Sequence, residues 1–253
     1  MEAAGKGFSM RIWGYVLLVG FGLAQAAVGG SASVSVAMTN DVHVTWAFST
    51  EVRVEAVVSG SGSISGFPED GWVAEGTNLL LEAEPAPYFY FARWEGDTNS
   101  VENPLSLVVT DPLDVVAVFA ADRAPRGTPH WWLEHYDLTN SGELSFEEAE
   151  QVVGCPHGFA AWQEYVADTD PTDPADFFPP LVLQFDGEQW QVMIGQTSTS
   201  RWYTVEHAAT LMPPDWQVYT NAPGTGASWV QEIGTGTNAM RFFRARVSLP
   251  DEE

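Results

Sequence analysis

Oxygen-bearing side chains between Asp137 and Glu148 are spaced as the ligands of a twelve-residue calcium loop are spaced. Asp137 takes the first position and Glu148 the twelfth, while Gly142 stands at the sixth, where such a loop turns sharply. The other candidate ligands are the side chains of Ser141 and Ser145 and the main-chain carbonyl of Glu143. A hard cation takes about six to eight oxygens. The spacing therefore predicts a calcium site, completed by water.

The same residues have a second interpretation that needs no metal. Thr139 stands at the third position, where Asp or Asn is usual, so only two side-chain carboxylates remain and the expected affinity for Ca²⁺ is weak. Ser145 and Glu148 also form the pattern of a capping box, with a helix continuing to Val153 and ending at Gly154. The sequence leaves open both an EF-hand-like loop and a helix cap.

The sequence contains none of the catalytic motifs that were sought. It contains no His-Glu-x-x-His, no Gly-x-Ser-x-Gly, no phosphate-binding loop and no dinucleotide fingerprint. Cys155 is the single cysteine, which excludes an intramolecular disulfide, and Cys155 and His157 have too few partners for a zinc site. We therefore expect a protein that is not an enzyme and has no cofactor besides the predicted Ca²⁺.

Composition predicts a mainly β protein. The chain has 23 glycines, 16 prolines and 17% charged residues, which favours short strands joined by turns. Its formal net charge is -24, and such a field repels phosphate backbones and anionic lipid. We therefore expect no nucleic-acid partner.

Residues 1–26 have the pattern of a signal peptide. Lys6 and Arg11 precede an apolar run, Ile12 to Ala24, and Ala24-Gln25-Ala26 offers a cleavage site. The run is too short to span a bilayer comfortably, and no later segment is long enough, so we expect no membrane span in the mature chain. The pattern predicts a secreted or cell-surface protein; an uncleaved N-terminal anchor is the alternative.

The chain contains an internal repeat. Residues 34–48 align without gaps with residues 105–119, and each copy alternates apolar residues around a polar turn, as a β-hairpin does. The offset of the two copies predicts a module of about 70 residues. We therefore expect a partial repeat, a hairpin, at 27–49 and a complete β module at 50–121.

The complete module resembles a known family of repeats. The resemblance rests on Gly60-Ser61-Gly62, Gly76-Thr77, Leu79 to Ala83, Pro85, Tyr88 to Phe91, Trp94-Glu95-Gly96-Asp97, Asn103-Pro104 and Val115 to Phe119. Together these strings resemble the divergent internalin-B-type B-repeat of bacterial surface proteins. The resemblance implies a small β-grasp-like fold in an exported, multimodular protein. It carries no catalytic residues, and core packing is the favoured role of Trp46, Trp72 and Trp94 over a ligand platform.

Residues 122–178 are predicted to form a short helical linker. Thr128 is placed to cap a helix that begins at Pro129 and runs through Tyr136, and 159–167 form a second amphipathic stretch. An Asp-Pro segment, 168–174, follows. The run resembles linkers of exported bacterial proteins with thrombospondin type 3-like calcium-binding repeats, although the segment from 152 to 158 has no carboxylate.

Alternation returns in residues 179–250 and predicts a C-terminal β-sandwich-like module. On the last strand, Phe243, Ala245 and Val247 alternate with Arg244, Arg246 and Ser248. Trp202 and Trp216 are candidates for a sugar-stacking platform, with core packing as the alternative. Two functions follow: a structural or interaction component in adhesion or matrix, whose partner is an extracellular protein or glycan, or a carbohydrate-binding accessory protein.

Overall fold

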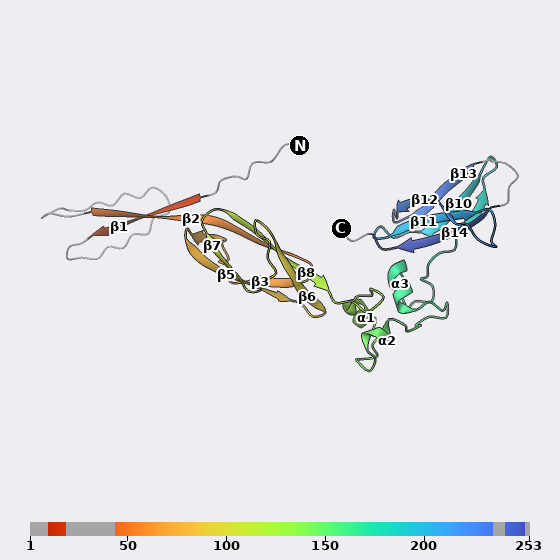
Figure 1. Cartoon of the computed structure of the whole chain (residues 1–253), viewed down its shortest axis with the longest axis horizontal. Coiled ribbons are helices and arrows are strands. Elements are labelled where there is room, and N and C mark those ends of the chain that lie inside the picture. Colours follow the sequence, from red (N-terminus) through yellow and green to blue (C-terminus); the bar gives the residue numbers. More distant parts are fainter. Residues whose placement is uncertain (1–9, 19–43, 235–240, 251–253) are drawn as a thin grey trace. The chain divides into compact units, whose positions relative to one another are not determined.

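The computed structural model describes residues 10–18, 44–234 and 241–250 (Figure 1). The chain divides after Asp122 into two compact units. The mainly β prediction is confirmed, since strands dominate both units and the described residues contain three short helices. None of these helices is both long and apolar enough to cross a membrane.

The first unit is built of two sheets. Its strands are β1 (Met10–Leu18), β2 (Val44–Ser59), β3 (Gly62–Ser65), β4 (Trp72–Ala74), β5 (Thr77–Pro85), β6 (Phe89–Gly96), β7 (Leu105–Val109) and β8 (Leu113–Ala121). One sheet of the described residues has the order β1-β2-β8-β6 with β4 also paired to β2, and the other has the order β3-β5-β7. Strands β2 and β8, the first and last of the repeat module, pair in parallel, which is typical of β-grasp-like folds.

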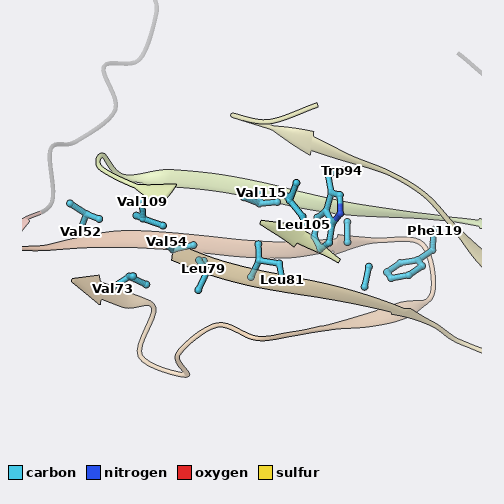
Figure 2. Close-up of a cluster of buried hydrophobic side chains, with 12 residues drawn as sticks. Val52, Val54, Val73, Leu79, Leu81, Trp94, Leu105, Val109, Val115 and Phe119 are labelled. Atoms are coloured by element: carbon cyan, nitrogen blue, oxygen red, sulfur yellow. The ribbon is translucent and has the colours of Figure 1, made fainter. Parts of the chain in front are cut away.

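A single apolar core lies between these two sheets (Figure 2). Strand β5 shows why the sequence folds this way: Leu79, Leu81 and Ala83 are buried, while the residues between them are exposed. Trp94 of β6 is the largest fully buried side chain, and its indole Nε1 donates to the carbonyl of Glu102 at 2.9 Å. The preferred role of Trp94, core packing, is confirmed.

The predicted hairpin at 105–119 has the right strands but the wrong pairing. The turn at 110–112 does separate β7 from β8, as expected. However, β7 pairs with β5, whereas β8 pairs with β2 and β6 in the other sheet. Both β7 and β8 bury one face in the core, and the connection between them passes from one sheet to the other.

Two predictions for the N-terminal region meet the structure only in part. Met10–Leu18, inside the predicted signal peptide, is strand β1 and pairs with the first half of β2. Of the predicted partial repeat, residues 27–43 lie outside the described residues, and 44–49 begin β2. Cleavage near residue 26 would remove β1, and both export and the partial repeat stay predictions.

The second unit begins with three short helices, α1 (His130–His135), α2 (Phe146–Ala149) and α3 (Ala161–Ala167), around their own apolar core. All three are shorter than expected. Helix α2 ends at Ala149 rather than Val153, and the next residue, Glu150, is its C-cap. Glu150 is 1% exposed and accepts hydrogen bonds from the Arg126 N–H and the Thr128 hydroxyl. Thr128 therefore does not cap α1, whose N-cap is Pro129.

The C-terminal strands form two three-stranded sheets. They are β9 (Val182–Phe185), β10 (Trp190–Gln196), β11 (Trp202–Ala208), β12 (Gln217–Pro223), β13 (Ser228–Gly234) and β14 (Phe242–Ser248). Among the described residues the orders are β13-β10-β9 and β12-β11-β14. Val192 and Ile194 from one sheet and Tyr203 and Val205 from the other share a buried cluster. The predicted sandwich-like module is present.

Arg201 joins the helical segment to these strands inside the second unit. Its guanidinium is largely buried and donates to the carbonyl of Val166 at 2.8 Å and to that of Tyr165 at 2.6 Å. It also forms an ion pair with Asp168, at 3.2 Å. These contacts hold the end of α3 against the start of β11.

Candidate functional site

The predicted calcium loop has the turn that the pattern requires. Gly142 has φ +85°, and the N–H of Ser141 donates to the Asp137 carboxylate at 2.8 Å. Glu148, the expected twelfth ligand, is occupied elsewhere: its Oε2 accepts from the Ser145 N–H at 3.0 Å and from the Ser145 hydroxyl at 2.7 Å. These hydrogen bonds hold the pKa of Glu148 below its usual value. The capping box is therefore confirmed.

The other residues of this loop bind to one another. The Glu143 carboxylate accepts from the Asn140 amide, and the buried Thr139 donates its hydroxyl to Glu134 at 2.9 Å. Thr139 thus has a packing role at the position where a ligand was expected. The described residues contain no group of three or more His, Cys, Asp or Glu side chains arranged to hold a metal ion. Calcium binding stays a prediction, which calorimetric titration of the chain and its Asp137→Ala variant tests.

Cys155 and His157 lie in a buried polar cluster. The Cys155 thiol donates to the carbonyl of Pro171 at 3.0 Å, and burial raises the thiol pKa, assisted by Glu164 and nearby aspartates. His157 Nδ1 lies 3.1 Å from Oε1 of Glu164, which is 2% exposed. Burial raises the pKa of Glu164, although a hydrogen bond from Thr169 and the proximity of His157 oppose the shift. The cluster joins the segment before α3 to α3.

A small pocket opens on the outer face of the sheet β12-β11-β14. Strand alternation places it there, because Tyr203 and Val205 point into the sandwich while their neighbours point outward. Its volume is about 280 Å³, and its lining combines one aromatic face with four polar side chains and one leucine: Trp202, Thr204, Asn221, Arg246, Ser248 and Leu249. Cross-strand register brings them together, since Thr204 is paired with Asn221 on one side and with Arg246 on the other.

Of the two predicted platform residues, Trp202 lines this pocket and Trp216 does not. Trp202 is 36% exposed and lies on the outward face. Trp216 is partly buried, and the Arg244 guanidinium covers its ring at 4.4 Å from the centroid. Arg244 is also paired with Glu206 at 2.6 Å. One indole is therefore available to a ligand here, and the second is packed beneath an ion pair.

Sequence reasoning missed the polar half of the pocket. The outward direction of Arg246 and Ser248 could be predicted, because they alternate with apolar residues along the last strand. The positions of Asn221 and Thr204 beside each other could not be predicted, since nothing in their local sequence shows that β11 pairs with β12. Thr204 donates its hydroxyl to Asn221 Oδ1 at 3.0 Å.

A comparison with protein families identifies the repeat module of the first unit. Residues 51–123 match the model of the divergent InlB B-repeat domain. This module is a divergent InlB B-repeat. The resemblance seen in the sequence is confirmed, and the family is typical of bacterial surface proteins, which favours a modular surface or extracellular protein. No curated protein and no solved structure gives a match. The likeness to thrombospondin type 3 linkers has no support from these comparisons.

The most distinctive motif of the B-repeat, Trp94-Glu95-Gly96-Asp97, has a structural role. Trp94 fills the core, and Gly96 has φ +101° with the Asp114 carbonyl so close that an added Cβ would lie 2.3 Å from it. The Asp97 carboxylate accepts from the Asp114 N–H at 2.9 Å, which joins the end of β6 to β8. These residues of the B-repeat therefore stabilise its fold, whereas the pocket beside the exposed face of Trp202 lies in the second unit.

Proposed function

We propose that this protein works without catalysis as an exported interaction component of the bacterial surface or extracellular matrix, and that its ligand is a glycan. The B-repeat supports the first part of the proposal, because it is a domain typical of bacterial surface proteins. The second part of the proposal specifies the class of ligand for this interaction role. One observation carries it: a half-exposed indole at the edge of a polar pocket on the face of the C-terminal sandwich.

The chemistry of the pocket suits a sugar. A pyranose presents an apolar face of C–H groups that stacks on an indole, and a rim of hydroxyls that exchange hydrogen bonds with polar side chains. Trp202 supplies the stacking surface, while Asn221 and Ser248 supply hydrogen-bonding groups beside it. The volume of about 280 Å³ is close to the lower end of the range of small-molecule sites, about 300 to 1,000 Å³, and suits one ring of a longer chain.

The test is a glycan array probed with the chain from Ala27 onward, followed by titration of any glycan that binds. Trp202→Ala should abolish binding. Trp131→Ala is the matched control, because Trp131 is 41% exposed in the same unit and lies outside the pocket, so its loss should leave affinity unchanged. An array without signal, or equal effects of the two variants, would refute the glycan proposal.

The absence of catalysis and the export are tested separately. Any bound glycan should be recovered intact after long incubation with the protein; cleavage would overturn the non-enzymatic part of the proposal. N-terminal sequencing of protein collected from the culture medium or cell envelope should begin at Ala27. A chain that retains residues 1–26 would favour the uncleaved anchor.

A further inference from the structure

The pocket beside Trp202 is an exception to the charge of the rest of the protein. The chain carries 34 acidic residues against 10 lysines and arginines, yet none of the residues that line this pocket is acidic. The single charged side chain in the lining is Arg246. Since carboxylates are abundant elsewhere in the chain, a pocket lined by an arginine and neutral groups indicates selectivity for negative charge in the ligand.

The two arginines that β14 presents on this face differ in their partners. Arg244 donates Nε to Glu206 at 2.6 Å and covers Trp216, so its charge is neutralised within the sheet. Arg246, two residues further along the same face, has no ion pair or hydrogen bond among the described residues and is exposed. The guanidinium of Arg246 is therefore open to a ligand that enters the pocket.

The neighbours of Arg246 are also arranged to donate hydrogen bonds. Asn221 Oδ1 already accepts from Thr204 at 3.0 Å, which leaves the Asn221 amide N–H groups without an acceptor among the described residues. Ser248 adds a hydroxyl at the same edge of the sheet, opposite Trp202 in the strand register. Guanidinium and amide donors beside one aromatic face match a ring that carries an anionic group.

We propose that this pocket binds an acidic sugar residue, stacking its ring on Trp202 and pairing its carboxylate or sulfate with Arg246. This inference rests on the proposed glycan-binding function and adds the charge of the ligand. Because the whole chain is strongly acidic, it repels uniformly charged polyanions, so the ligand is an isolated or terminal acidic residue in a glycan of low charge density. A planar guanidinium that meets a carboxylate or sulfate forms charge-assisted, often bidentate, hydrogen bonds.

The experiment titrates the chain from Ala27 onward with three methyl glycosides that share one ring: the glucoside, the glucuronide and the glucoside 6-sulfate. Binding is followed through the indole N–H signals in NMR spectra, and Trp202→Ala assigns the signal of the pocket. We expect the acidic sugars to bind about tenfold or more tightly than the glucoside, the usual effect of a charge-assisted hydrogen bond. The glucuronide and the sulfate distinguish recognition of a carboxylate from recognition of either anion.

Variants distinguish the acidic-sugar inference from the glycan-binding function on which it rests. Arg246→Gln should reduce the affinity for the acidic sugars to that for the glucoside, whereas Trp202→Ala should abolish binding of all three. Arg93→Gln is the control for net charge, because Arg93 is an exposed arginine of the B-repeat, and it should change nothing. Equal affinity of the wild type for all three sugars would overturn the acidic-sugar inference alone. Binding of none of them, together with an array that shows binding to other, neutral glycans, would also overturn the acidic-sugar inference alone, whereas no signal in either experiment would overturn the glycan proposal as well. A preference that survives Arg246→Gln would overturn the assignment of the anion to Arg246.

Discussion

Replacement of Leu81 by alanine should destabilise the B-repeat strongly, while the same replacement at Leu80 should have almost no effect. The two residues are adjacent on β5, but Leu81 is 0% exposed and Leu80 is 55% exposed. Leu81 lies opposite the buried Leu105, whereas Leu80 lies opposite Ser106. The pair therefore tests which face of β5 is buried.

The magnitude follows from the burial. Leu81→Ala removes three carbons from the core, worth about 0.8 kcal/mol each, and the remaining cavity raises the cost to about 3 kcal/mol. A domain of about 70 residues has a total stability of only about 7 kcal/mol, at about 0.1 kcal/mol per residue. The substitution should thus raise the unfolded population of the B-repeat about a hundredfold. Leu80→Ala should stay within about 0.5 kcal/mol of the wild type.

Hydrogen exchange followed by mass spectrometry measures both effects in the intact chain. Peptides from β5 and β8 should exchange about a hundredfold faster in Leu81→Ala, and peptides from β11 should be unchanged because the C-terminal module has its own core. The reasoning is refuted if Leu80→Ala accelerates exchange as much as Leu81→Ala does. That result would mean that β5 is shifted by one residue, since such a shift exchanges the buried and exposed faces.

Three further predictions concern the second unit. Ser145→Ala should cost about 1 kcal/mol in chemical denaturation, because it removes the cap of α2, while Ser145→Asp restores most of the loss; a neutral alanine variant would contradict the cap. Arg201→Met should cost about 2 kcal/mol, since two partly buried carbonyls lose a charged donor, and equal stability of the variant would rule out the contacts described. The raised pKa of Glu164 means that its contribution to stability is present at low pH and lost as the pH rises through the folded-state pKa. Glu164→Gln should therefore gain stability relative to the wild type with rising pH. A stability difference that is constant with pH would contradict this.

The faces of the strands could be predicted from the sequence, but their partners could not. Alternation is a local property, and the burial of β5 follows it, whereas in β11 Thr204 and Glu206 are buried as well as Tyr203 and Val205. It gives no information about hydrogen-bonding partners, so β7 and β8 look like a hairpin although they belong to different sheets. Helix ends failed for a similar reason. The helical pattern continues to Val153, but Glu150, directly after α2, accepts a hydrogen bond from the N–H of Arg126, 24 residues away.

The residues of the candidate site could be predicted where the sequence of one strand was sufficient, but not where they depend on contacts between strands. Trp202 stands out by residue type, and Arg246 by its position opposite apolar neighbours. The role of Trp216 could not be predicted, because it depends on an arginine from β14, 28 residues further along the chain. The calcium loop was ambiguous since one carboxylate, Glu148, satisfies two patterns, and only the geometry shows it bound to Ser145.

The separation of the two cores has a consequence for how stability and binding respond to mutation. Substitutions in distant, independent sites have additive effects on free energy. The core of the B-repeat and the pocket beside Trp202 share no residue and belong to different compact units. Leu81→Ala should therefore leave the affinity for a sugar unchanged at temperatures where the C-terminal module stays folded. A loss of affinity in Leu81→Ala would show that the B-repeat takes part in binding, and that the pocket alone does not account for it.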